Sequence, residues 1–317
     1  MIRQSWIVFL FAFILSFESI LIEYLTLLLG ISPLAISAFS IAISGTLLLL
    51  ILKFVYKRQI PLFCSFKDFV PASIFLSVGV FTWYDAVSRV GASKESLLAG
   101  PIEIIVVLFL ARIFLYEKLN RKQLSGVGIA LVGFIIVLLS DHNISNNGII
   151  NVTIIEVETL NFSITFGDIE AIISAISFAL AVFFLAKLSK KYSPLEISGM
   201  CLLLSGLILI IVMLIFTPEM SVNLFMSYWY IFIIFSLLPL FGTICYVEGI
   251  KRIGASLTAT IASSRILLTL IIQILLTHIG IRNTLPDNVL LALIGGILGI
   301  TGIIIIHMHF YFSKHTN

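Results

Sequence analysis

The sequence predicts an all-α integral membrane protein of ten transmembrane helices, arranged as two inverted five-helix repeats with the N- and C-termini in the cytoplasm. Three observations lead to this prediction. The composition is strongly apolar, ten apolar runs of membrane-spanning length follow one another along the chain, and a short motif of the first half returns in the second half.

The composition excludes an ordinary cytosolic protein. The 317 residues are 60% hydrophobic and 11% charged, with a mean hydropathy of +1.18, whereas soluble domains have roughly 45 to 50% apolar and 25% charged residues. The net charge of +3 is too small to indicate a nucleic-acid-binding surface. Cys64, Cys201 and Cys245 have no CxxC or CxxH neighbours, so neither a disulfide framework nor a metal site is predicted.

Ten apolar runs are long enough to cross a membrane. A hydrocarbon core about 30 Å thick needs about 20 apolar residues in helical form, because each peptide group must be satisfied within its own segment. The first run is longer than a signal peptide, contains Glu18 and Glu23 and lacks an A-x-A-like cleavage site, so we interpret it as a retained helix. The predicted spans are residues 5–29, 33–52, 69–88, 93–116, 124–140, 167–186, 195–216, 228–249, 255–280 and 289–307.

Basic residues predict the orientation, because Lys and Arg are retained on the cytoplasmic side during insertion. With the N-terminus inside, 14 of the 19 basic residues fall on the cytoplasmic side and 3 on the outer side, namely Arg89, Lys94 and Arg282. One missed or invented central span would abolish this asymmetry. We therefore expect cytoplasmic termini and a multi-pass protein of the plasma membrane.

The longest connection, residues 141–166, contains no Lys or Arg and is predicted to lie outside the cell. It contains three N-x-S/T sequons, at Asn143, Asn151 and Asn161, which would be acceptors if the source organism glycosylates its surface proteins. A polar, Asn-rich loop also produces such triplets by chance. Both interpretations stay open.

The chain contains an internal repeat. The segment RVGAS at residues 89–93 returns as RIGAS at residues 252–256, an offset of 163, and at the same offset Asp85 corresponds to Glu248. A second set of glycines matches at an offset of 169 between the fifth and tenth spans: Gly126 and Gly133 with Gly295 and Gly302.

The repeat divides the chain into residues 1–140 and residues 167–317, joined by the external loop 141–166. Each part contains five predicted helices, and because five is odd the two parts cross the membrane in opposite directions. Inverted repeats are typical of secondary transporters, whose substrates bind near the bilayer midplane at the interface between the repeats.

A family resemblance rests on four features of the first half: RVGAS at residues 89–93, Pro101 within the fourth span, Glu117-Lys118 at its cytoplasmic end, and the glycines of the fifth span. Together they resemble the repeat of the drug/metabolite transporter (DMT) superfamily, EamA type. The resemblance implies a basket-shaped bundle with a central cavity, lined largely by the third, fourth, eighth and ninth spans. It also implies transport of small metabolites, often as export. Ser264 departs from the pattern, because it stands at the position of Pro101.

Charged side chains deep within the spans are the candidate functional residues. A charge at the bilayer centre costs about 2.5 to 3.5 kcal/mol on insertion scales, so such a residue should face a cavity or a partner. Glu18, Glu103 and Arg265 lie near the middle of the first, fourth and ninth spans. Arg112 lies one turn from the inner end of its span, and we interpret it as an anchor that extends to the cytoplasmic interface.

Four further acidic residues are expected to have local roles. Glu23 lies closer to the outer surface and is interpreted as interfacial. Glu95 lies in the first turn of the fourth span, where a carboxylate interacts favourably with the helix dipole. Asp85 and Glu248 lie near helix ends and are expected to pair with neighbouring basic residues.

Arg265 belongs to a polar stripe on the ninth span, formed with Thr258, Ala262, Thr269 and Gln273, because residues at this spacing share one helix face. Shorter polar stripes occur on the third and eighth spans. These faces are predicted to border water, although hydrogen bonding between helices is an equally simple use of buried hydroxyl groups. The candidate substrate-binding residues are Arg265, Glu103, Glu18, Tyr84, Thr269 and Tyr246.

Glu103 and Arg265 occupy nearly equivalent positions in the two halves and could approach each other across the cavity. A static salt bridge would offset much of their burial cost without any substrate. Alternatively, the Arg265 guanidinium binds a substrate carboxylate or phosphate through two hydrogen bonds, while Glu103 or Glu18 balances the charge. Either acid could also carry a coupling proton. One arginine with one or two acids favours amino-acid-like substrates or organic anions.

These observations favour a secondary transporter that exports a small polar metabolite by alternating access, with the lipid bilayer and the substrate as its partners. The sequence contains no P-loop for ATP hydrolysis, and its five histidines lie at span ends or in loops, so no enzyme activity, cofactor or bound metal is predicted. Two alternatives stay open, a flippase for lipid-linked substrates and a non-transporting membrane scaffold. A homodimer also stays open.

Overall fold

The computed structural model describes residues 2–57, 66–115, 121–140, 165–216, 218–281, 285–286 and 288–315, and all regular elements within these ranges are helices. The described part of the chain is therefore all-α, as predicted. In chain order the helices are α1 (Ile2–Leu29), α2 (Pro33–Phe54), α3 (Phe66–Val90), α4 (Ala92–Leu115), α5 (Arg121–Leu139), α6 (Phe166–Leu188), α7 (Pro194–Phe216), α8 (Pro218–Ile253), α9 (Ala255–Ala262), α10 (Arg265–His278) and α11 (Val289–His315).

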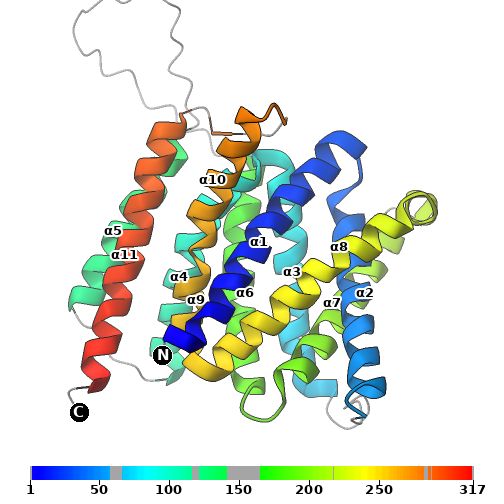
Figure 1. Cartoon of the computed structure of the whole chain (residues 1–317), viewed down its shortest axis with the longest axis horizontal. Coiled ribbons are helices and arrows are strands. Elements are labelled where there is room, and N and C mark those ends of the chain that lie inside the picture. The colour runs from blue at the N-terminus through cyan, green and yellow to red at the C-terminus, as the bar shows by residue number, and fades with distance from the viewer. Residues whose placement is uncertain are drawn as a thin grey trace, which may run out of the picture.

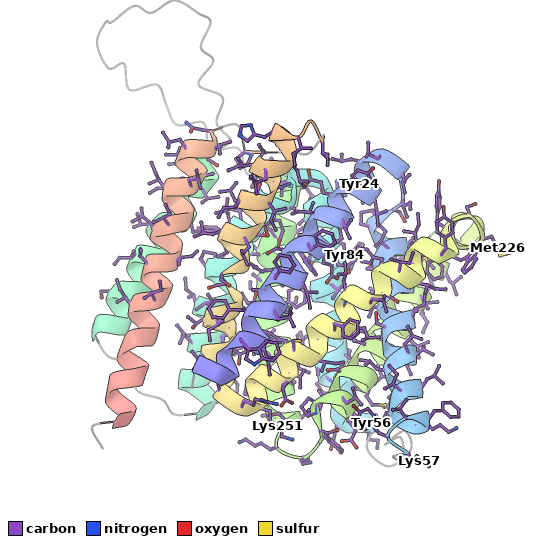
Figure 2. The ribbon with its side chains drawn as sticks, viewed as in Figure 1. Tyr24, Tyr56, Lys57, Tyr84, Met226 and Lys251 are labelled. Atoms are coloured by element: carbon purple, nitrogen blue, oxygen red, sulfur yellow. The ribbon has the colours of Figure 1, made fainter. Side chains whose placement is uncertain are left out.

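The helices stand side by side in one bundle (Figure 1). α5 and α11 pack mainly against each other and flank one side of the bundle, whereas α2, α7 and α8 lie on the other side. α1 begins and α11 ends at the same end of the bundle. Lys57 and Lys251 lie at that end too, and Tyr24 lies toward the opposite end (Figure 2). Residues predicted to share the cytoplasmic side therefore share one end of the bundle.

The bundle is apolar outside and contains many small polar side chains inside. Large side chains on its surface, such as Ile211 and Ile234, are more than half exposed, whereas Ser44 and Ser205 are fully buried. The buried hydroxyls donate to backbone carbonyls, in some cases of another helix, as in the 2.6 Å bond from Ser44 to the carbonyl oxygen of Ser236. This distribution suits a lipid solvent, which contacts apolar surface without penalty but cannot satisfy polar groups.

Seven helices of the described residues are long and apolar enough to cross a membrane, judged by length and composition. Two shorter apolar helices, Gly128–Val137 and Val289–Gly302, accompany them. The chain is therefore a multi-pass membrane protein, and the count of ten spans remains a prediction. The seven are Trp6–Leu29, Pro33–Phe54, Phe66–Val90, Phe166–Leu188, Pro194–Phe216, Met226–Ile253 and Ala255–His278.

The two copies of the repeated motif form the same kind of turn. Gly91 is the single residue between α3 and α4, and Gly254 is the single residue between α8 and α9. Their φ angles are 84° and 88°. Glycine adopts such angles without steric cost because it has no Cβ. The motif thus reverses the chain directly from one helix into the next in both halves.

The matched glycines of the fifth and tenth spans lie at the contact between α5 and α11. A Cβ atom added to Gly133 would lie 2.5 Å from the carbonyl oxygen of Gly295, and one added to Gly302 would lie 2.5 Å from that of Gly126. Small residues allow two helix backbones to approach this closely. The glycine pattern is therefore a packing device that holds α5 and α11 together.

The ninth predicted span, residues 255–280, is interrupted near its middle, between α9 and α10. The Ser263 hydroxyl donates to the carbonyl oxygen of Thr260 at 2.6 Å. The Ser264 amide donates to the carbonyl oxygen of Ile261 at 3.1 Å. Bonds that reach back three residues tighten a helical turn. The ninth span is therefore present at nearly its predicted length, Ala255–His278, with the helix locally tightened at Ser263 and Ser264.

Candidate functional site

A cavity lies at the centre of the bundle, near the mid-length of the helices. The volume open to the centre of a water molecule is about 90 Å³, enough for several water molecules. Residues of α1–α4 and α6–α10 line it, so more helices contribute than the resemblance implied. Its walls are mainly apolar and aromatic, with Phe11, Trp83 and Phe178 among them, and the charged residues of the lining are Glu18, Glu103 and Arg265.

The structure brings Arg265 and Glu103 together, as their positions in the two halves suggested. The Arg265 Nη2 and Glu103 Oε2 atoms are 3.6 Å apart. The guanidinium also lies over the indole of Trp83, with 5.8 Å between Cζ and the ring centroid. Because Arg265 is only 3% exposed, the acid and the aromatic face replace contacts that water would otherwise make.

The backbone at Arg265 is fixed by two hydroxyl groups. Ser16 of α1 donates to the Arg265 carbonyl oxygen at 3.2 Å, and Thr269 donates to the same oxygen at 2.8 Å. Thr269 is fully buried and lies outside the cavity lining. Thr269 thus lies one helical turn after Arg265 and stabilises the start of α10.

Glu18 faces the cavity from α1 and is 1% exposed. The hydroxyl of Tyr84 donates to its Oε1 atom at 2.5 Å. Tyr84 lies in the middle of the bundle (Figure 2) and is fully buried behind the cavity wall. The hydrogen-bond partner of this acid is therefore a neutral hydroxyl, and Arg265 is close enough to interact with its charge.

Tyr246 lines the cavity from α8, with its ring centroid 4.5 Å from that of Phe11. Its hydroxyl is buried and lies beside the Glu103 carboxyl, with which it interacts. Tyr246 therefore belongs to the same polar group of the cavity as Glu103 and Arg265.

Two acids lie deeper in the protein than the sequence indicated. Glu95 is fully buried, and its Oε2 atom accepts a hydrogen bond from the Trp83 indole at 3.1 Å. Glu23 is 2% exposed and accepts the Ala92 amide at 3.0 Å, so it is buried between helices beside the turn from α3 to α4. The turn between α3 and α4 covers both side chains. Their burial depends on packing between distant segments, and the periodicity of the sequence does not reveal such packing.

The expected pairing at helix ends is confirmed for both acids of the repeat. Arg89 Nη2 lies 2.9 Å from Asp85 Oδ2, and Arg252 pairs with Glu248. Several further residues singled out by the sequence lie outside the described part of the structure: the Arg112 side chain, Glu117, Lys118, Asn143, Asn151 and Asn161.

No group of three or more His, Cys, Asp or Glu side chains that could hold a metal ion occurs in the part of the chain that the structure describes. The ionisable groups of the site are thus two acids and one arginine around a small cavity. Such a set can bind a charged or zwitterionic solute through ion pairs and hydrogen bonds.

Comparisons with known proteins bear on the fold and the family. No curated protein matches the chain. Among 28 matching chains of solved structures, one described as "Crystal structure of protein" has a TM-score of 0.64 at 15% sequence identity, and covers 95% of this chain and 97% of its own. This likeness concerns the fold alone.

The sequence model of the EamA-like transporter family matches residues 4–139 and 165–308. Because these two repeats make up most of the sequence, the chain belongs to the EamA-like transporter family.

Proposed function

We propose that the protein is a secondary transporter that exports a small polar metabolite across the plasma membrane by alternating access around the central cavity. The family points to a membrane transporter of small molecules rather than an enzyme. The observation that carries the proposal is the Arg265–Glu103 pair in the cavity wall, opposite a second acid, Glu18. Charges this deep in a membrane are expensive, so they are expected to serve a substrate or ion pathway.

The charges of the cavity favour an amino-acid-like substrate. Arg265 can bind a carboxylate through two parallel hydrogen bonds, in exchange for its contact with Glu103. Glu18 has a neutral hydrogen-bond partner and can bind an ammonium group. A zwitterion thus interacts with both Arg265 and Glu18, whereas an organic anion interacts with Arg265 alone.

Alternating access would use the two family repeats as the moving halves. In the proposed topology of ten spans with cytoplasmic termini, residues 1–140 and 167–317 cross the membrane in opposite directions and enclose the cavity between them. Rocking of one half against the other would expose the cavity to each side in turn. Glu18 is the proposed carrier of a coupling proton, because its carboxyl can exchange a proton for the substrate ammonium group without leaving an uncompensated charge.

The test is counterflow in proteoliposomes that contain the purified protein, with pooled labelled amino acids and organic acids. Wild type is expected to exchange an amino acid. Arg265→Ala is expected to abolish exchange, and Glu18→Gln is expected to weaken exchange and to lose accumulation driven by a proton gradient. Arg252→Ala serves as the control, because Arg252 is about half exposed and pairs with Glu248 at a helix end, away from the cavity lining.

The two alternative functions give different results in the same assay. If no soluble solute exchanges while a fluorescent lipid is moved between leaflets, a flippase for lipid-linked substrates replaces the proposal. If neither moves and Arg265→Ala behaves like wild type in folding and in partner binding, a membrane scaffold replaces it.

A further inference from the structure

The first turn of α4 makes an unusual set of contacts. Four consecutive residues, 92–95, each bind a different helix: α1, α10, α6 and α3 in that order. We name residues 92–95 the α4 clasp. It lies at the end of the bundle where α3 turns into α4, opposite the end where α1 begins.

The first two residues of the α4 clasp donate backbone hydrogen bonds to side chains of other helices. The Ala92 amide donates to Glu23 of α1 at 3.0 Å, and the Ser93 amide donates to Gln273 of α10 at 2.8 Å. The side chains of Glu23 and Gln273 are themselves joined by a hydrogen bond. The first amides of a helix have no partner within it, so here α1 and α10 cap α4 and tie three helices together.

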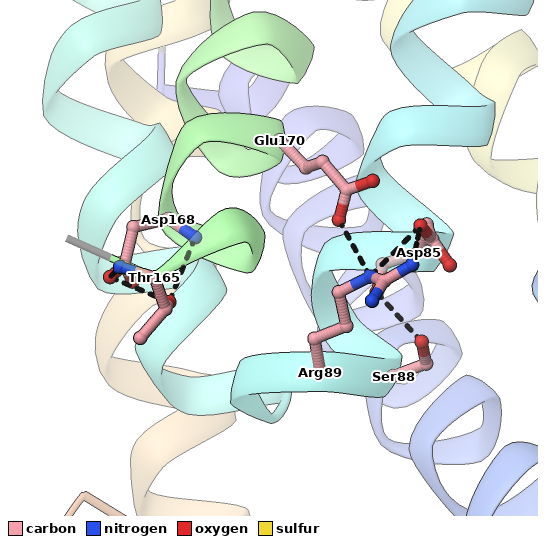
Figure 3. Close-up of polar contacts among 6 residues, drawn as sticks. All are labelled: Asp85, Ser88, Arg89, Thr165, Asp168 and Glu170. Atoms are coloured by element: carbon pink, nitrogen blue, oxygen red, sulfur yellow. Dashed lines mark hydrogen bonds and ion pairs between the residues drawn. The ribbon is translucent and has the colours of Figure 1, made fainter.

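The third residue of the α4 clasp forms a buried ion pair. Lys94 Nζ lies 2.9 Å from Asp168 Oδ1 at the start of α6, and the two side chains are 5% and 3% exposed. Asp168 is held by a capping box in which its carboxylate accepts the Thr165 amide at 2.9 Å (Figure 3). Removal of one partner of a buried ion pair leaves an uncompensated charge, so separation of α4 from α6 requires water to reach both groups.

A second ion-pair group borders the α4 clasp at the surface. Arg89 contacts Asp85 of its own helix and lies 3.0 Å from Glu170 of α6 (Figure 3). Its side chain is 48% exposed. This exposed group adds little stability by itself, but it bridges α3 to α6 beside the buried pair.

The fourth residue connects the α4 clasp to the cavity. Glu95 accepts a hydrogen bond from the indole N–H of Trp83. Trp83 in turn lines the cavity, and the Arg265 guanidinium lies over its ring. A solute that draws Arg265 away from Trp83 would remove this contact from the face of the indole. The indole is hydrogen-bonded to Glu95, the chain neighbour of Lys94.

The corresponding turn of the second half lacks these groups. Aligned on RVGAS and RIGAS, Leu257 stands at the position of Lys94 and Thr258 at that of Glu95. The Thr258 hydroxyl donates to the carbonyl oxygen of Gly254 within its own turn. The same backbone turn thus carries an ion pair and an acid at one end of the bundle and apolar or locally bonded residues at the other.

We propose that the α4 clasp is the gate that closes the cavity at the α3–α4 end of the bundle, and that the Glu95–Trp83 hydrogen bond couples the gate to occupancy of the cavity. The proposal rests on the proposed transport function. The gate opens when α4 separates from α6 and α10, and a solute at Arg265 promotes this step through Trp83.

Trp83 itself can report on the gate, because it is 3% exposed and lies between the α4 clasp and the cavity. Replacement of Trp6 and Trp229 by Phe leaves it as the single tryptophan of the chain. The experiment measures iodide quenching of this parent in lipid nanodiscs, where both faces are in contact with buffer. Lys94→Met is expected to raise the quenching constant about threefold or more, because the open population increases when a buried pair is lost.

Two matched variants separate gating from general loss of structure. Lys191→Met removes an exposed ion pair with Asp68 at the other end of α6, and Lys94→Arg keeps the buried charge. Both are expected to leave quenching at the parent level. The gate proposal is overturned if the quenching constant of Lys94→Met equals that of the parent. It is also overturned if Lys191→Met or Lys94→Arg raises the quenching constant as much as Lys94→Met does.

The coupling is tested at Glu95. Glu95→Gln retains an oxygen that accepts the Trp83 indole N–H, so its quenching constant is expected to equal that of the parent. Glu95→Leu has no such acceptor, and its quenching constant is expected to be higher. Equal quenching of the two overturns the coupling. Transport is measured on the same variants. Absence of transport in the parent, with quenching as expected, contradicts the transport function alone, whereas transport with unchanged quenching contradicts the gate alone.

Discussion

At the scale of single residues, the low dielectric of a membrane interior makes every unpaired charge costly. Arg265 is placed between Glu103 and the ring of Trp83, and Glu18 is bonded to the Tyr84 hydroxyl. Each of these contacts compensates a side chain that lipid could not solvate. A substrate therefore has to exchange contacts with these side chains rather than simply add new ones.

The Arg265–Glu103 pair leads to a stability prediction. Arg265→Met leaves Glu103 unpaired and is expected to lower the free energy of unfolding by about 3 to 5 kcal/mol. Arg265→Met/Glu103→Met is expected to lose less than the sum of the single changes, because it removes both charges. The measurement is the unfolding midpoint of the four proteins in one detergent. Additive losses would show that the two side chains do not interact.

Sequence reasoning found the charges of the site but missed some of their partners. The depth of Glu18, Glu103 and Arg265 in their spans was enough to identify them, because a charge inside an apolar run needs compensation. The roles of Glu95 and Trp83 were missed. They are 12 residues apart, on either side of the turn at Gly91, and only the direction of that turn brings them together.

At the scale of elements, the glycines that match between the halves hold α5 against α11. This contact depends on backbone proximity, since added Cβ atoms at Gly133 or Gly295 would meet the backbone of the facing helix. Most helix ends also follow local signals. α2 starts at Pro33 after Ser32, whose side chain accepts the Ala35 amide, and α6 starts with a capping box.

A pair of alanine substitutions tests the α5–α11 contact. Gly133→Ala is expected to destabilise the protein by about 1 to 3 kcal/mol, because the added methyl group forces the two helices apart. Gly128→Ala on the same helix is the control, since a Cβ there would meet nothing within 4 Å, and it is expected to be neutral or slightly stabilising. Thermal unfolding in detergent compares them, and equal midpoints would exclude the close contact.

At the scale of the whole molecule, the predicted topology gives a labelling experiment. In a background without Cys64, Cys201 and Cys245, cysteines at Lys57 and Lys251 are expected to react only from the cytoplasmic side, because basic residues are retained there. The probe is a membrane-impermeant thiol reagent applied to intact cells and to inverted vesicles.

A cysteine at Ile281, just after α10, gives the complementary measurement. It is expected to react only from outside the cell, because an odd number of predicted spans separates it from Lys57 and from Lys251. Reaction of positions 57 and 251 from opposite sides would contradict the ten-span topology. Reaction of all three positions from one side would also contradict it.

The sequence by itself determined the membrane class, the family, the repeated turns at Gly91 and Gly254, and the charged residues of the cavity. These features are local or periodic, so composition, spacing and motif are enough to reveal them. The tertiary structure alone decided that Arg265 pairs with Glu103, that Tyr84 binds Glu18, that the ninth span divides into α9 and α10, and that residues 92–95 bind four helices. These depend on which faces of distant helices meet, and that is set by side-chain packing across the bundle rather than by any single segment.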